Sequence, residues 1–246
     1  MRECRTGSLG TCGIRTPACG AGISSVGRRG IRGYRPDPVP RTLIEDILRI
    51  AMRAPSSMNT QPWNFYVITG EPLDRIRQGN TERMIAGVPQ SREFRTGKPF
   101  AGPHRDRQIG VAKQLFSAMG IARDDADARQ DWVLRGFRQF DAPVCIIITY
   151  DRELDGSDDT PFDCGAVATA LVNAAWSRGL GTVINSQGIM QSPVVREHAG
   201  IADDQVIMKS IALGWPDESF PANAVVSTRK SVDEAAVFVG FEESAQ

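Results

Sequence analysis

Residues 54–63 read Ala54-Pro55-Ser56-Ser57-Met58-Asn59-Thr60-Gln61-Pro62-Trp63, and they lie between a helical segment and a strand-like segment. Upstream, apolar residues recur at helical spacing from Leu43 to Ala51, which predicts a helix that ends before Pro55. Downstream, residues 64–69 are mostly aromatic or β-branched, which predicts a strand. The stretch itself is too rich in serine, carboxamide and proline to form core. Its short donors and acceptors suit a planar ligand that carries many nitrogen and oxygen atoms.

A second informative stretch, Arg28-Arg29-Gly30-Ile31-Arg32, lies upstream of the predicted helix. Guanidinium groups donate charge-assisted hydrogen bonds to phosphate, so this stretch has the chemistry of a phosphate site. Each stretch also has a plainer interpretation. The arginines are compatible with a solvated charged surface, and residues 54–63 with a tight loop whose side chains bond to one another. Together the two stretches favour a phosphorylated cofactor with a polar ring, such as flavin mononucleotide (FMN).

The composition is that of a soluble globular protein of 246 residues, with 41% hydrophobic and 24% charged residues. The formal net charge is zero, which argues against a nucleic-acid partner because nucleic-acid binders carry a basic excess. No apolar run reaches the ~20 residues of a membrane-spanning helix, so no membrane partner is expected. The odd total of five cysteines favours a reducing compartment, and we expect a cytoplasmic location.

The first 23 residues differ from the rest of the chain. They lack the apolar core of a secretory signal. Their three cysteines (Cys4, Cys12 and Cys19) have no histidine nearby and make a poor zinc site. We expect residues 1–23 to be a disordered extension, with an arginine-rich transit segment or a misassigned start codon as open alternatives. Residues 24–246 show no repeat and no break in composition, which predicts a single domain.

Three further strands are predicted from apolar runs bounded by turn residues, at residues 143–150, 182–184 and 206–213. The first of these is continuously apolar, which indicates burial on both faces. Residues 162–178 predict a helix rich in glycine and alanine. Its small side chains permit close approach either to the sheet or to a second subunit.

Two more helices are expected at residues 111–119 and 124–140, whose apolar side chains either pack in the ordinary way or cover a cavity. Residues 87–110 show no clear pattern. A short helix is expected to run through Glu197, with the Ser192 side chain as its N-cap.

The sequence gives little support for a metal site or for a dinucleotide-binding domain. The only two histidines, His104 and His198, are far apart in the sequence, which is too few for a multi-histidine metal site. The acidic residues Asp158, Asp159 and Asp163 do not match an EF-hand loop, and we expect a solvated loop that caps the following helix. No Gly-x-Gly-x-x-Gly fingerprint follows a predicted strand, which disfavours a Rossmann domain. We therefore expect no metal.

The two stretches resemble those of the nitroreductase family of FMN-dependent oxidoreductases. Residues 54–63 match the family pattern Ala-Pro-Ser-(Ser/Gly)-x-Asn-x-Gln-Pro-Trp at every fixed position. Residues 28–32 match Arg-Arg-Ser-(Ile/Val)-Arg except at Gly30. The resemblance covers residues 24–243. It implies an α+β fold, a three-layer α/β/α sandwich with a central mixed, mainly antiparallel sheet, and a homodimer with FMN at the subunit interface.

The resemblance also implies a set of cofactor-binding residues. The early arginine segment and a late arginine are expected at the phosphate, residues 55–57 on one face of the ring, and residues 59 and 61 at its polar edge or ribityl chain. The turn at residues 185–188 is expected to bring backbone N–H groups toward flavin N5 and O4, and Gly214 belongs to a Gly-x-Pro turn. The expected set is Arg28, Arg29, Gly30, Arg32, Pro55, Ser56, Ser57, Asn59, Gln61, Asn185, Ser186, Gln187, Gly188, Gly214 and Arg229.

This chain departs from the family pattern at two positions. Gly30 lacks the hydroxyl that usually helps to hold the cofactor. Ser227 stands where the family often carries a basic residue two positions before Arg229, while Lys230 follows instead. The phosphate is therefore expected to rest chiefly on Arg28, Arg32 and Arg229.

The implied reaction is two-electron transfer from NADH or NADPH to FMN and then to a nitroaromatic or quinone-like acceptor. Because donor and acceptor would share one cavity, ping-pong kinetics are expected. The flavin carries the hydride chemistry, so no dedicated catalytic side chain is expected. Alternatives within the family are dehalogenation, flavin fragmentation and azoline oxidation, and a non-catalytic flavin-binding protein is a further alternative.

Overall fold

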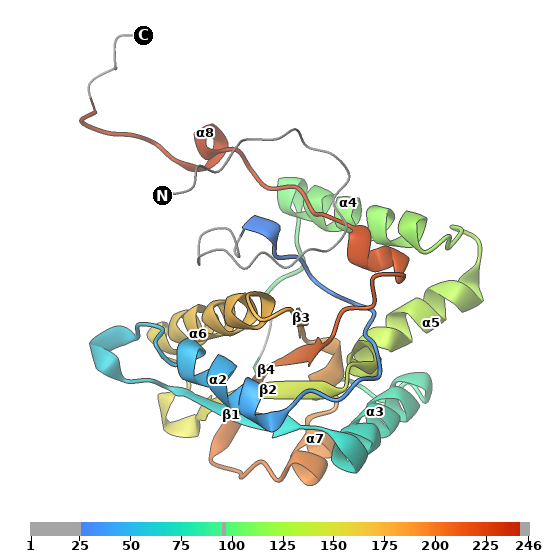
Figure 1. Cartoon of the computed structure of the whole chain (residues 1–246), viewed down its shortest axis with the longest axis horizontal. Helices are drawn as coiled ribbons and strands as arrows, with labels where there is room; N and C mark the ends of the chain where they lie inside the picture. Colours follow the sequence, from blue (N-terminus) through green and yellow to red (C-terminus); the bar gives the residue numbers. More distant parts are fainter. Residues whose placement is uncertain (1–25, 95–96, 242–246) are drawn as a thin grey trace, which may run out of the picture.

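The computed structural model describes residues 26–94 and 97–241, and in them a four-stranded sheet carries helices on both faces (Figure 1). Neighbouring strands are antiparallel, and an isolated parallel bridge joins Gly30 to Thr182 at one edge. The expected α+β class with a mainly antiparallel sheet is confirmed. In order across the sheet, the strands are β1 (Trp63–Ile68), β2 (Val144–Asp151), β4 (Gln205–Gly214) and β3 (Gly181–Asn185).

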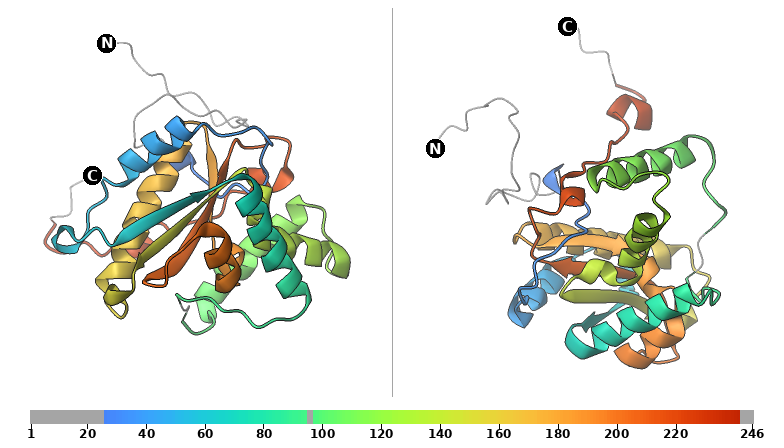
Figure 2. Two further views of the ribbon diagram at one scale, coloured as in Figure 1. Left: turned by 90° about the horizontal axis from the view of Figure 1, so that it is seen from below. Right: turned by 90° about the vertical axis from the view of Figure 1, so that its right-hand side faces the viewer.

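Strand β2 lies at the centre of the core and confirms the expectation of burial on both faces. Val144, Ile146 and Ile148 pack against α2 (Arg41–Ala51) and α6 (Asp159–Trp176). The alternate residues Cys145 and Ile147 pack on the other side, against α3 (Gly70–Ile85) and α7 (Ser192–Ala199). This two-residue alternation follows from the pleat of a strand. It produces the expected three layers, helix, sheet and helix, seen in Figure 2.

Helix α4 (Gly102–Ala118) is set apart from these layers. Leu115 is its only buried residue, and Figures 1 and 2 show the helix beside the C-terminal segment rather than on the sheet. The helix begins well before the expected residue 111, with Pro103 in its first turn, where the missing N–H does no harm. Its start was not predicted because few of its residues are buried, so the sequence shows no apolar period.

Helix α5 (Ala126–Phe137) ends earlier than expected. Gln139, Phe140 and Asp141 have φ values of 57°, 55° and 57°, which are left-handed and incompatible with a continuing α-helix. The chain turns there into the 3₁₀ segment η2 (Gln139–Asp141). The remaining short elements are η1 (Ser57–Asn59), η3 (Arg152–Leu154), η4 (Gln187–Ile189), η5 (Pro221–Ala224) and α8 (Val232–Ala235).

Two local expectations were wrong. Ser192 is the first residue of α7 and not its cap, since Gln191 occupies the N-cap position and the Ser192 hydroxyl donates to the Ser91 carbonyl. Asp163 is not in a solvated loop, because α6 begins at Asp159 and the Asp163 side chain is 3% exposed.

Several expectations concern the membrane, the cysteines and the N-terminal extension. None of the helices in the part of the chain that the structure describes has the length and apolar content of a membrane span. Cys145 and Cys164 are buried free thiols. The proposed extension and its three cysteines lie outside the described residues.

Candidate functional site

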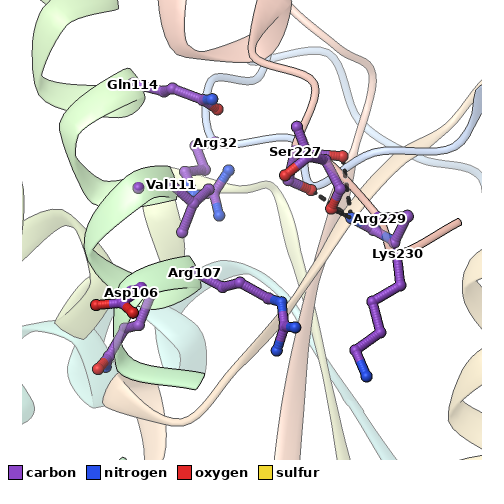
Figure 3. A pocket seen from close by; sticks show the side chains of 11 residues that line it. Arg32, Asp106, Arg107, Val111, Gln114, Ser227, Arg229 and Lys230 are labelled. Carbon is purple, nitrogen blue, oxygen red and sulfur yellow. Dashed lines mark hydrogen bonds between the residues drawn. The ribbon is translucent and has the colours of Figure 1, made fainter. Parts of the chain in front are cut away.

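Basic residues from three separate parts of the chain meet around one cavity of about 980 Å³ (Figure 3). One wall comes from the early arginine segment, one from α4, and one from the C-terminal segment that precedes α8. The lining residues are Arg32, Asp106, Arg107, Gln108, Gly110, Val111, Gln114, Ser227, Thr228, Arg229 and Lys230.

Asn223 ties the early arginine segment to the C-terminal segment. Its side chain is fully buried. Its Oδ1 accepts the backbone N–H groups of Arg32 at 2.7 Å and Gly33 at 3.1 Å, and its Nδ2 donates to the carbonyls of Gly33 and Asp217. A Cβ at Gly33 would overlap the Phe220 ring, which explains the glycine. This fully bonded amide fixes the backbone from which Arg32 reaches the cavity.

Two of the expected phosphate residues are brought together, since Arg32 and Arg229 line the same cavity. Arg28 is not part of the lining. Burial lowers the pKa of Arg28, and the charge of Arg229 lowers it further. Burial also lowers the pKa of Arg32. Nearby like charges lower the pKa of an arginine, and a bound anion would reverse that effect.

Ser227 proves to act on Arg229. The Arg229 Nη1 donates to the Ser227 Oγ at 2.7 Å, to the Ser227 carbonyl at 3.1 Å and to the Thr228 carbonyl at 3.0 Å. The residue that lacks the usual positive charge therefore orients the arginine two positions later.

Arg29 lies apart from the cavity lining. Its Nε donates to the Asn223 carbonyl at 2.6 Å, and its guanidinium lies 5.8 Å from the centre of the Trp176 ring. These contacts brace the early segment against the end of α6. Gly30 is not part of the cavity lining either, but its carbonyl accepts from Arg32 Nη1 at 3.3 Å.

The loop at residues 54–63 is largely exposed and has an unusual backbone. Met58, Asn59 and Gln61 have φ values of 50°, 61° and 46°, which costs free energy at each non-glycine residue. Two bonds hold this shape: Asp163 Oδ2 accepts the Ser57 N–H at 3.0 Å, and Ser56 Oγ accepts the Gln61 N–H at 2.9 Å. The loop thus presents its side chains outward from a fixed backbone.

Asp163 is a functional-site residue that sequence reasoning missed. It was assigned to a solvated acidic loop with Asp158 and Asp159. A usable signal existed, because Asp163 lies four residues before Val167 and eight before Leu171, on the buried face of α6.

The loop and the arginine cluster lie at opposite ends of α6 (Figure 1). Asp163, which bonds the loop, is near the start of the helix, and Trp176, which contacts Arg29, is its last residue. A rise of 1.5 Å per residue separates these two residues by ~20 Å. Within the described chain, the two motifs therefore contact α6 at points well apart along the helix.

The turn after β3 is held by a buried polar network. Asn185 Nδ2 donates to the Gly136 carbonyl at 2.7 Å, and Asn185 Oδ1 accepts the Gln187 N–H at 2.9 Å. On the other side, Asn80 Nδ2 donates to the Gly188 carbonyl at 2.6 Å and its Oδ1 accepts the Gln191 N–H at 3.1 Å. Asn185 therefore uses its amide within the protein. Asn80, which fixes the turn from α3, was not predicted.

Two further contacts involve the turn, and Gly214 lies at the other end of β3, opposite Gly181. Lys209 Nζ donates to Ser186 Oγ at 2.7 Å. Burial lowers the pKa of Lys209, and the charge of Arg92 lowers it further. A Cβ at Gly188 would overlap the Gln139 amide, whose Nε2 is buried without a partner among the described residues. Gly214 is explained by packing, since a Cβ there would overlap Pro143.

Comparison with known proteins assigns the chain to a family. A model described as the nitroreductase family matches residues 26–215. The chain belongs to the nitroreductase family. The match includes the early arginine segment, the loop at residues 54–63 and the turn at residues 185–188, and it ends before Arg229. The membership expected from the two motifs is therefore confirmed.

Its relatives in this family include enzymes named for nitroaromatic substrates. The nitrobenzene nitroreductase of Ectopseudomonas oleovorans is 39% identical over 216 residues, covering 86% of this chain and 93% of that protein. The chloronitrobenzene nitroreductase of Comamonas testosteroni is 36% identical over 216 residues, with the same coverage of 86% and 93%.

Solved nitroreductase structures share the fold. The FMN- and NADPH-dependent nitroreductase NfnB from Sphigopyxis sp. strain HMH superposes with a TM-score of 0.85 at 29% identity, covering 91% of this chain and all of that chain. The FMN-dependent NfnB from Mycobacterium smegmatis, in complex with NADPH, gives 0.82 at 25% identity, covering 89% of this chain and 98% of that chain.

Proposed function

We propose that this member of the nitroreductase family is an FMN-dependent oxidoreductase that takes electrons from NADH or NADPH and reduces a nitroaromatic or quinone-like acceptor. One observation carries the proposal. Arg32 from the early segment and Arg229 from the C-terminal segment line one cavity, and the charge of Arg229 also acts on Arg28. The relatives named for nitrobenzene and chloronitrobenzene support the acceptor class.

The residues present fit a flavin phosphate. Arginine forks match the geometry of phosphate oxygens, and several of them share its double charge. Arg28, Arg32 and Arg229 would hold this group, and the Gly30 carbonyl bonds the Arg32 guanidinium. The lowered pKa of Arg28, caused by burial and by Arg229, would rise again once a phosphate is bound.

We assign the ring contacts to a second copy of the chain. Asp163, which bonds the loop at residues 54–63, and Trp176, which contacts Arg29, are ~20 Å apart along α6, which exceeds the length of the ribityl chain that joins flavin ring and phosphate. In a homodimer, Pro55, Ser56, Ser57, Asn59 and Gln61 of one copy would cover the FMN whose phosphate is held by the other. The cofactor then lies at the subunit interface.

Exposed apolar surface supports a dimer. Met58 is 94% exposed at the tip of the loop, and Phe162 is 78% exposed near the start of α6. The C-terminal segment exposes Val237, Phe238, Val239 and Phe241 by 64% to 89%. Apolar side chains exposed to this degree are costly in a monomer and typical of a subunit contact.

Within this site, the protein would position the reactants, and the cofactor would carry out the chemistry. When bound, FMN supplies the hydride chemistry, so we assign no catalytic role to a side chain and no metal. The turn at residues 185–188, fixed by Asn185 and Asn80, would offer backbone donors to the edge of the ring where negative charge develops on reduction.

We further propose that residues 24–246 act as one FMN-binding domain in a reducing, cytoplasmic compartment. The one sheet and the two free thiols of the described part support these two statements.

The test is reduction of the purified protein's flavin. We expect a yellow protein whose FMN is bleached anaerobically by NADH or NADPH and reoxidised by nitrobenzene or a quinone. A protein that takes up no FMN would contradict the proposal. FMN that binds but is not reduced by either nucleotide would indicate a flavin-binding protein without reductase activity.

A further inference from the structure

Helix α4 contributes a basic residue to the cavity that neither motif contains. Arg107 lines this cavity together with Arg32 and Arg229, although it lies far from both in the sequence. We infer that Arg107 binds the FMN phosphate and takes the place of the basic residue that this chain lacks at Ser227. The inference rests on the proposed function, since it names one more residue of the same phosphate site.

The direction of the Arg107 side chain supports its role at the phosphate. In Figure 3, Arg107 extends from α4 toward the segment that holds Arg229 and Lys230, whereas Asp106 extends to the other side of the helix. Hydrogen bonds from Ser231 lower the pKa of Glu234, and the charges of Lys230 and Arg107 add to the effect, so the two cations act on the same acid.

The balance of charges in the cavity lining also supports this role. The cavity lining contains Arg32, Arg107, Arg229 and Lys230 against the single acid Asp106. A phosphate monoester carries a charge of about −2 at neutral pH, so the lining has charge to spare for one. The position that usually adds a cation, Ser227, instead holds Arg229 through its hydroxyl at 2.7 Å. Arg107 faces the same space from the opposite wall and restores the missing charge.

Arg105 offers a matched control on the same helix. It is an exposed arginine two residues before Arg107, and residues two apart on a helix do not share a face. Arg105 lines a different cavity, with Phe116 and Ile121, and its Nη1 donates to Gln108 Oε1 at 2.6 Å. Gln108, which is uncharged, also lines the proposed phosphate cavity, so loss of the Arg105 charge changes the net charge of α4 but removes no cation from that lining.

The experiment compares FMN with riboflavin, which lacks the phosphate. Apoprotein is prepared from wild type, Arg107→Gln, Arg107→Lys and Arg105→Gln, and the Kd for each flavin is measured by fluorescence titration. We expect Arg107→Gln to weaken FMN binding about tenfold, as expected for a lost hydrogen bond to a charged group, with riboflavin binding unchanged. Arg107→Lys should recover part of the loss, and Arg105→Gln should match wild type.

Each other outcome overturns the inference. If Arg107→Gln binds FMN as wild type does, the residue does not hold the phosphate. If FMN and riboflavin affinities fall together, Arg107 has a structural role only. If the KM for NADPH rises while the KM for NADH and the FMN affinity do not, the cation serves the 2′-phosphate of the donor. Wild-type protein that binds neither flavin would contradict the proposed function itself.

Discussion

Gly30 is where this chain departs from the family motif inside the arginine segment. A Cβ added there would lie 3.4 Å from Arg32 Nη1, which is a tolerable contact with a mobile guanidinium. A serine at this position therefore fits, and its hydroxyl would lie beside Arg32.

We predict that Gly30→Ser strengthens FMN binding two- to tenfold, because a net hydrogen bond contributes about 0.5–1.5 kcal/mol. The measurement is the Kd of the apoprotein for FMN. Gly97→Ser, at a glycine with no neighbour within 4 Å, adds the same hydroxyl elsewhere and should change nothing. Weaker binding in Gly30→Ser would mean that the space beside Arg32 is needed by the cofactor itself.

The two buried thiols allow a prediction about reactivity. Burial raises the pKa of Cys145 to about 12. Burial, together with the charge of Asp163, raises the pKa of Cys164 to about 12. Because the thiolate is the reactive form, iodoacetamide at pH 8 should leave both residues unmodified in the folded protein and modify both after denaturation.

The sign of the pH dependence follows from these raised values. The folded state holds both protons more tightly than the unfolded state, so the thiols contribute stability below the ordinary pKa of 9.0 and lose that contribution as the pH rises further. Mass spectrometry of native protein labelled at pH 8 checks the prediction, and rapid labelling of either cysteine would contradict it.

The sequence predicted residues whose role depends on the chemistry of the side chain. It did not predict residues whose role depends on which distant backbone group the side chain contacts. Arg28, Arg32 and Arg229 were expected at a phosphate because cationic side chains supply the charge that a phosphate needs, and the structure places Arg32 and Arg229 at one cavity. Asn223 and Asp163 were missed because their importance lies in which backbone N–H they meet, 191 and 106 residues away in the chain. No local pattern encodes such a pairing.

The secondary-structure elements also differ in how well the sequence predicts them. The strands and α2 were predicted closely because they bury a regular apolar face. Helix α4 and the end of α5 were not, since α4 buries almost nothing and α5 stops at three residues with left-handed backbone. Helix α4, which lines the proposed phosphate cavity, is thus the helix with the weakest apolar pattern in the sequence.

The turn after β3 gives a prediction at the level of an element. We expect Asn80→Ala to leave the Gly188 carbonyl and the Gln191 N–H without partners, which costs ~2–3 kcal/mol of unfolding free energy. Urea denaturation measures the loss. Gln78→Ala, on the exposed face of the same helix, should stay within about 0.5 kcal/mol of wild type.

The expected effect on the cofactor separates positioning from simple destabilisation. At a temperature where both proteins are folded, Asn80→Ala should also weaken binding of FMN, because the turn no longer holds its donors. Unchanged stability in Asn80→Ala would show that the network does not fix the turn.

The division of the site between two chains is a proposal that the resemblance implied and that no local residue pattern supplies. Both motifs could be recognised in the sequence, yet their contacts with opposite ends of α6 depend on the packing of Asp163 and Trp176. We propose that the exposed apolar residues beyond α8 contribute to the same subunit contact.

We predict that a chain ending at Ala235 is monomeric by sedimentation and loses FMN. The truncation removes Val237, Phe238, Val239 and Phe241, which are exposed and make no contribution to the core of the described part. Circular dichroism should show a folded protein. A truncated chain that still sediments as a dimer would show that the tail is not part of the interface.

Co-expression of two differently tagged variants tests the shared site directly. One chain carries Arg32→Gln and Arg229→Gln. The other carries Asn59→Gly and Gln61→Gly, where glycine tolerates the observed φ values of 61° and 46°. Each variant alone should bind little FMN. The heterodimer, isolated through both tags, should bind one FMN, because one of its sites takes intact arginines from one chain and an intact loop from the other. A heterodimer as empty as its parents would show that each site is built within a single chain and would contradict the proposed arrangement.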